Sequence, residues 1–92
     1  MKAPSAAHVI AKGRVQGVGF RYFVQETAEH LELKGWVRNL PNGDVEAEAV
    51  GEIAAIENWL DALRKGPTLA RVETLQVDWR PINESYLDFS IR

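Results

Sequence analysis

Two short segments of this chain carry residues whose types and spacing could do chemistry. The first reads Gly13-Arg14-Val15-Gln16-Gly17-Val18-Gly19-Phe20-Arg21, and the second reads Gly35-Trp36-Val37-Arg38-Asn39. Glycines let the backbone approach a ligand closely, and free N–H groups at the start of a helix attract anions. Arg21 adds a planar, permanently charged fork that suits phosphate oxygens. The first segment therefore predicts a cradle for an oxyanion.

The glycine segment matches neither of the common nucleotide-binding loops. It lacks the Gly-Lys-Ser/Thr ending of a P-loop, and Tyr22 stands where a dinucleotide-binding loop needs a third glycine. Arg21 strengthens the anion interpretation, because the helix dipole disfavours a cation in the first turn unless an anion compensates it. An exposed arginine paired with a carboxylate is the alternative that these residues leave open.

Asn39 is the second candidate, and two interpretations fit it. Pro41-Asn42-Gly43 follows closely, so Asn39 fits an ordinary turn residue, which is the stronger interpretation from these residues alone. In the functional interpretation, its side-chain amide holds a water for attack on phosphorus, because an amide both accepts and donates hydrogen bonds.

Other chemistries lack their usual residues. The chain has no cysteine and no Gly-x-Ser-x-Gly segment, so acyl-enzyme chemistry has no obvious nucleophile. We expect His8 and His30 to be structural or surface residues, and no His, Asp and Glu group has the spacing of metal ligands. The three tryptophans sit at core-like periods, and we expect all of them to be packing residues: Trp36, Trp59 and Trp79.

Length and charge limit the class of protein. Ninety-two residues suffice for one domain with a core, predicted over residues 1–92 with residues 1–6 as a flexible N-terminal tail. A net charge of −2 provides no general basic field, so we expect no nucleic-acid partner. No apolar run approaches the roughly 20 residues that span a bilayer, and the first seven residues lack the apolar stretch of a signal peptide, so we do not expect them to be one. We therefore expect no membrane partner, a cytoplasmic location and, for so small a domain, a monomer.

Apolar periodicity predicts the elements that must position the two segments. Alternating residues predict strands over 8–15, 36–40, 45–50, 72–80 and 87–91, and stripes of helical spacing predict helices over 20–31 and 53–63. Gly35 is the predicted stop of the first helix, and Gly66-Pro67 closes the second. Asn42-Gly43 predicts a hairpin, because both residues tolerate positive φ.

This order predicts an α+β fold, a ferredoxin-like split β-α-β sandwich (βαββαβ) with a short extra C-terminal strand. Two helices would cover one face of an antiparallel sheet. In that topology the first and second strands run parallel with the third between them, so their C-terminal ends lie at one edge of the sheet. We therefore expect the loop over residues 16–20 to face Asn39.

The two segments together resemble the signature of the acylphosphatases, and the similarity extends to the Asn42-Gly43 hairpin and the closing Phe89-Ser90-Ile91 strand. The resemblance implies an enzyme that hydrolyses the carboxyl–phosphate bond of acyl phosphates, with no cofactor and no metal. Carried over by position, it implies that Arg21 and the loop backbone bind the phosphate and that Asn39 orients the attacking water. The implied loop residues are Gln16, Gly17, Val18, Gly19, Phe20 and Arg21.

The resemblance also sets expectations for the reaction. We expect direct attack by water without a phosphoenzyme, and inorganic phosphate as both product and competitive inhibitor. Leu40 departs from animal members, which often carry a hydroxyl residue there, and we expect this to affect rate rather than activity. The alternative is a ferredoxin-like regulatory or nucleic-acid-binding module without catalysis, which would share the fold.

Overall fold

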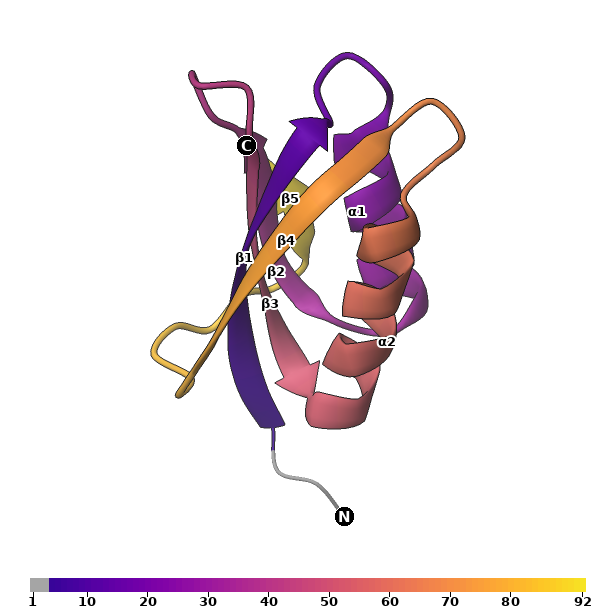
Figure 1. Cartoon of the computed structure of the whole chain (residues 1–92). Helices are drawn as coiled ribbons and strands as arrows, with labels where there is room; N and C mark the ends of the chain where they lie inside the picture. Colours follow the sequence, from indigo (N-terminus) through magenta and orange to yellow (C-terminus); the bar gives the residue numbers. More distant parts are fainter. Residues whose placement is uncertain (1–3) are drawn as a thin grey trace.

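The computed structural model describes residues 4–92. The elements follow in the order β1 (Pro4–Arg14), α1 (Phe20–His30), β2 (Lys34–Asn39), β3 (Val45–Glu52), α2 (Ile53–Lys65), β4 (Arg71–Arg80) and β5 (Phe89–Ile91). The strands form one sheet in the order β4-β1-β3-β2-β5, and both helices lie on the same face of it (Figure 1). The predicted α+β ferredoxin-like sandwich is confirmed.

The pairing of the strands brings the ends of β1 and β2 to the same edge of the sheet. Strand β3 pairs antiparallel with both β1 and β2, so β1 and β2 run parallel to each other with β3 between them. This confirms the predicted arrangement of the two segments. The short strand β5 pairs parallel with β2, which makes the sheet mixed rather than purely antiparallel.

Strand β1 begins earlier than the sequence indicates. Residues 4–6 pair with residues 50–52 of β3, although the sequence places them in a tail; residues 1–3 of that tail lie outside the described residues. Proline, serine and alanine have low strand propensity, so the pattern gives no strand signal there. Backbone pairing with β3 holds these residues in the strand, although their side chains have little strand propensity.

Gly35 is not the stop of the first helix. Helix α1 ends at His30, Leu31 caps it, and Glu32 takes the positive φ of 59°. Gly35 instead lies inside β2, where φ is 148° and a Cβ would overlap the backbone carbonyl oxygen of Glu48 on β3. Glycine is therefore needed here for the close approach of two strands. Gly66, in contrast, ends α2 as predicted.

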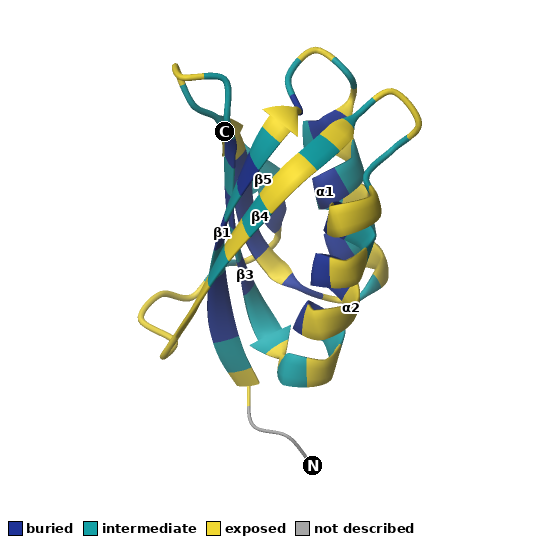
Figure 2. Cartoon of the chain, in the orientation of Figure 1, coloured by how far each residue is buried: buried dark blue, intermediate teal, exposed yellow. Residues whose placement is uncertain are grey.

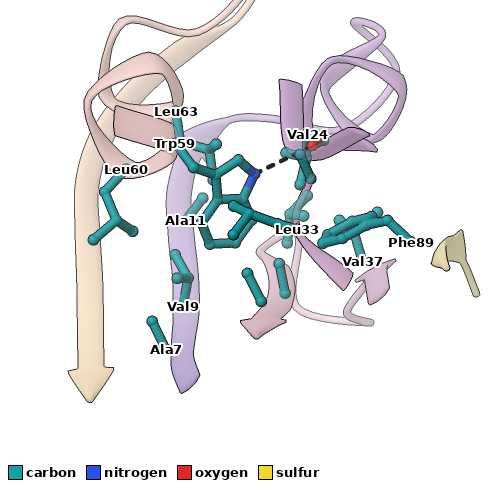
Figure 3. Packing of buried hydrophobic residues seen from close by; sticks show 14 of the residues in the cluster. Ala7, Val9, Ala11, Val24, Leu33, Val37, Trp59, Leu60, Leu63 and Phe89 are labelled. Atoms are coloured by element: carbon teal, nitrogen blue, oxygen red, sulfur yellow. Dashed lines mark hydrogen bonds between the residues drawn. The ribbon is translucent and has the colours of Figure 1, made fainter. Parts of the chain in front are cut away.

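The core lies between the sheet and the helices, where the buried surfaces of both layers face each other (Figure 2). Trp59 of α2 is at its centre (Figure 3): its indole Nε1–H donates to the Val24 carbonyl of α1 at 3.2 Å, and its ring meets Phe89 edge to face at 6.0 Å. The buried tryptophan thus joins both helices and the last strand. Its donor is satisfied, so its burial is favourable.

The other two tryptophans lie outside this core. Trp36 is buried, but it neighbours core residue Val37 along β2 and so points to the sheet face without helices. There the guanidinium groups of Arg38 and Arg92 stack on its ring at 5.5 and 4.8 Å. Trp79 on edge strand β4 is 43% exposed, so the prediction that it is a packing residue is wrong. An edge strand has a neighbour on one side only.

Candidate active site

Three loops lie at the end of the molecule where β1 and β2 finish (Figure 1). They are the β1–α1 loop, the β2–β3 hairpin that follows Asn39, and the α2–β4 loop. The first segment that the sequence singled out contains the β1–α1 loop, and the second lies in β2 and ends at Asn39, where the hairpin begins. Residues 16–21 and Asn39 are therefore brought to the same end of the fold.

The β1–α1 loop presents an uncapped helix start. Gly17 and Gly19 have φ of 73° and 77°, a conformation that residues with a Cβ adopt rarely. Gly19 is the N-cap of α1 and supplies no side-chain cap, and the first turn contains no acidic residue. The helical hydrogen bonds begin with Phe23 N–H to the Gly19 carbonyl at 3.1 Å, so the preceding N–H groups have no acceptor within the helix. These donors favour an anion.

Arg21 lies half-buried at this helix start without a partner. Within the part of the chain that the structure describes, its guanidinium makes no ion pair or hydrogen bond, so the alternative of an arginine paired with a carboxylate does not hold. It lines a small cavity of about 130 Å³. The full lining consists of Val15, Gly17, Gly19, Phe20, Arg21 and Tyr22.

The side chains of two residues in the β1–α1 loop contact other parts of the fold instead of this cavity. Val18 packs against the hydrophobic core, and Gln16 turns its side chain toward the β2–β3 hairpin. Neither lines the 130 Å³ cavity. Lys12 is also turned away, because its ammonium pairs with Asp44 of the hairpin at 2.7 Å. Arg21 is thus the basic side chain that reaches the cavity.

Asn39 is the last residue of β2 and is paired with Val45, so it is not the turn residue that its neighbours suggested. The turn lies beyond it, where the Asn42 side chain accepts from the Asp44 N–H at 3.0 Å. The Asn39 Oδ1 atom is buried and accepts no hydrogen bond from any described residue. A buried polar atom without a partner is unfavourable by about 1–3 kcal/mol. This acceptor therefore marks a position that suits a polar ligand or a water.

The Gln16 side chain joins the two segments, a role that the sequence did not predict. Its Nε2 donates to the carbonyl oxygens of Leu40 and Asp44 at 2.8 and 2.9 Å. Leu40 follows Asn39 directly, so Gln16 fixes the glycine loop against the strand end that carries Asn39. An amide side chain in a glycine-rich loop is the only sequence signal of this contact, and it does not name the partner.

A charged cluster lies on the sheet face without helices. Glu46 on β3 contacts His8 Nε2 and Arg38 Nε, each at 2.6 Å. Burial raises the pKa of Glu46, but the hydrogen bonds and charges of His8 and Arg38 outweigh it, and the net effect lowers that pKa. His8 is therefore a structural residue in an ion-pair cluster, as the sequence predicted.

Among the described residues 4–92, no three His, Asp or Glu side chains converge closely enough to hold a metal ion. Neither helix in that range has the length and apolar character needed to cross a membrane.

Comparison with known proteins gives a consistent result. The sequence model of the family described as Acylphosphatase matches residues 7–91. An acylphosphatase of Syntrophotalea carbinolica is 46% identical over 89 residues, which cover 97% of each chain. The crystal structure of an acylphosphatase from Bacillus subtilis superimposes with a TM-score of 0.93 at 39% identity, covering 96% of this chain and 98% of that one. A structure from Coxiella burnetii gives 0.91 at 42% identity, covering 97% and 93%.

The fold and the loop geometry define an α+β sandwich with a glycine-rich loop and an uncapped helix start at one edge of its sheet. The chain belongs to the acylphosphatase family, and its fold and relatives make it a hydrolase of acyl phosphates. The resemblance seen in the sequence is confirmed. The alternative of a module without catalysis is not supported, and Trp36 on the open sheet face is covered by two arginines rather than free to stack on bases.

Proposed function

We propose that Arg21 and the N–H groups of the β1–α1 loop bind the phosphoryl group, and that Asn39 orients the water that attacks it. The observation that carries this proposal is the buried, unpartnered Asn39 Oδ1, held beside the loop by Gln16. Arg21 without an ion pair and a helix start without a cap supply the positive side of the site. Phosphoryl hydrolysis needs an acceptor that can orient a water and donors that can bind the phosphoryl oxygens, and we assign these two parts to Asn39 and to the β1–α1 loop with Arg21.

The chemistry follows from these groups. The water oxygen attacks phosphorus, the bond between phosphorus and the acyl oxygen breaks, and the electron pair leaves with the carboxylate. One water proton goes to a phosphoryl oxygen, so an acyl phosphate dianion and water give a carboxylate and dihydrogen phosphate. A carboxylate is a good leaving group, so positioning and charge stabilisation are sufficient without a general acid.

Direct attack by water is favoured over a phosphoenzyme. The segment 13–21 contains no hydroxyl, thiol, imidazole or carboxylate side chain, so the loop itself offers no nucleophile. We propose that the reaction proceeds without a metal. Hydrolysis in ¹⁸O-labelled water tests whether the attack is at phosphorus, because the label then enters the phosphate and not the carboxylate. Inversion of configuration at a chiral phosphoryl group supports direct attack by water, whereas a phosphoenzyme would give retention. Turnover that persists in EDTA supports the metal-free reaction.

Substitution of the two proposed residues tests the assignment with benzoyl phosphate as substrate. Arg21→Ala removes charge-assisted hydrogen bonds worth about 1.5–3 kcal/mol, so kcat/KM should fall by roughly 10- to 100-fold and phosphate inhibition should weaken. Asn39→Ala should lower kcat by roughly 100-fold or more with a smaller effect on KM.

Matched controls separate these effects from changes in folding. Arg14→Ala removes an exposed arginine from the same loop region, and Asn83→Ala removes an exposed asparagine far along the chain. Both controls should keep nearly full activity. Inorganic phosphate should compete with substrate in the unmodified protein and in both controls. Normal turnover of a folded Arg21 or Asn39 variant would reject the proposal.

A further inference from the structure

A second cavity, of about 350 Å³, adjoins the small cavity at Arg21. The two share the lining residues Gly19 and Tyr22, so they are adjacent at the start of α1. We call the larger one the outer groove and define it by Tyr22, Phe23, Glu26, Glu29 and Pro67. Pro67 comes from the α2–β4 loop, so the groove crosses from α1 toward that loop.

We propose that the outer groove holds the acyl part of the substrate, and that it selects uncharged acyl groups, aromatic ones above all, against those that carry a second negative charge. This inference rests on the proposed function, since it needs the phosphate to be held at Arg21. It specifies which class of acyl phosphate the site would accept. Nothing in the phosphate cradle itself distinguishes one acyl group from another.

The sizes and positions of the two cavities support the proposal. The cavity at Arg21 has about 130 Å³ and the outer groove has about 350 Å³, so the groove offers the larger space for the acyl group of a substrate whose phosphate lies at Arg21. In Figure 1 the β1–α1 loop stands between the hairpin that follows Asn39 and the loop that carries Pro67. In-line attack from the Asn39 side directs the leaving carboxylate toward the opposite side.

The near part of the groove suits an apolar or aromatic group. Tyr22 is 73% exposed, an unusual exposure for an aromatic side chain, and it lies directly after Arg21. Phe23 and Pro67 add apolar surface beside it. An aryl group that stacks against these side chains loses contact with water, which is favourable in proportion to the area covered.

The far part of the groove is negatively charged. Glu26 and Glu29 follow Tyr22 along α1, and neither forms an ion pair or side-chain hydrogen bond within the described chain. A substrate bound through Arg21 would bring a second carboxylate or phosphate toward these two charges. The repulsion is screened over about 8 Å at physiological salt, so it should be strongest at low ionic strength.

The test compares kcat/KM for acetyl, benzoyl and succinyl phosphate, the last of which carries a free carboxylate. The Glu26→Gln/Glu29→Gln double variant should raise kcat/KM for succinyl phosphate by roughly 3- to 10-fold at low salt, with less effect at high salt, while acetyl phosphate changes by less than about twofold. Glu73→Gln/Glu84→Gln, which removes two exposed glutamates elsewhere, is the matched control and should leave the succinyl-to-acetyl ratio unchanged.

Tyr22 is tested with both substrates and inhibitors. Tyr22→Ala should lower the benzoyl-to-acetyl ratio of kcat/KM by roughly 5- to 10-fold, and Tyr22→Phe should restore it. Phenylphosphonate should inhibit more strongly than methylphosphonate, and this preference should disappear in Tyr22→Ala. The inhibitor readout does not depend on hydrolysis, so it distinguishes failure of the groove from failure of the roles given to Arg21 and Asn39. Unchanged ratios in the Tyr22→Ala and the Glu26/Glu29 variants would overturn the proposal.

Discussion

At the scale of single residues, Gln16 connects the β1–α1 loop to the hairpin that follows Asn39. The Gln16 side-chain amide donates to the carbonyl oxygens of Leu40 and Asp44. Arg21 and Asn39 could be identified as candidate site residues from the sequence, because a glycine loop before a helix can bind an anion and a polar residue at a strand end can orient a ligand. The Gln16 contact could not be predicted, because it depends on how two loops that are distant in the sequence meet.

We predict that Gln16→Ala lowers kcat for benzoyl phosphate by roughly 10-fold while the inhibition constant of inorganic phosphate changes little. The substitution leaves the loop N–H groups and Arg21 in place but releases the strand end that carries Asn39, so water orientation suffers more than anion binding. Ser5→Ala, which removes a side-chain hydrogen bond to the Arg80 carbonyl near the start of β1, is the control for stability. Equal losses in kcat and in phosphate binding would contradict a positioning role.

At the scale of elements, hydrophobic periodicity predicted every helix and strand, but not their boundaries or all of their environments. Helix α1 and helix α2 each show a clear apolar stripe, and both were predicted within a few residues. Apolar periodicity does not show how many strands a given strand pairs with. The prediction that Trp79 is a packing residue therefore failed, because β4 is an edge strand. The prediction for Gly35 failed for a similar reason. A glycine after a helix suggests a helix stop, whereas this position requires glycine because the neighbouring strand β3 comes from another part of the sequence and approaches it closely.

We predict that Gly35→Ala destabilises the fold by about 3 kcal/mol or more. The added Cβ would overlap the Glu48 carbonyl oxygen, and both partners are backbone atoms of paired strands, so neither can move aside cheaply. Urea unfolding followed by tryptophan fluorescence measures the change. Gly43→Ala, in a hairpin position with open space around it, should be milder because only its φ of 98° is strained. A loss below that of Gly43→Ala would be inconsistent with this account of β2.

At the scale of the whole molecule, the two faces of the sheet are stabilised differently. One face packs against the helices through apolar residues, and the other carries an ion-pair cluster with Glu46 at its centre. The folded-state pKa of Glu46 is lowered, so its carboxylate contributes stability above the ordinary glutamate value of 4.5, and this contribution is lost as the pH falls through the lowered value.

We predict that the unfolding temperature of the protein falls below about pH 4.5, and that Glu46→Gln reduces this dependence. At neutral pH the variant should be less stable than the unmodified chain, since His8 and Arg38 lose a charged partner; at low pH the difference should shrink. Thermal unfolding between pH 3 and 7 in both proteins tests this. Parallel curves for the two proteins would show that Glu46 does not carry the effect.

The two hydrogen bonds from Gln16 to the hairpin have a consequence for which step limits the rate of catalysis. The β1–α1 loop and the hairpin are already joined in the free protein, so these two segments need not move together when substrate binds. Turnover in such a site should follow the strength of the bond that breaks. Acyl phosphates of more acidic carboxylic acids should therefore react faster, in a graded series set by the leaving group rather than by motions of the chain.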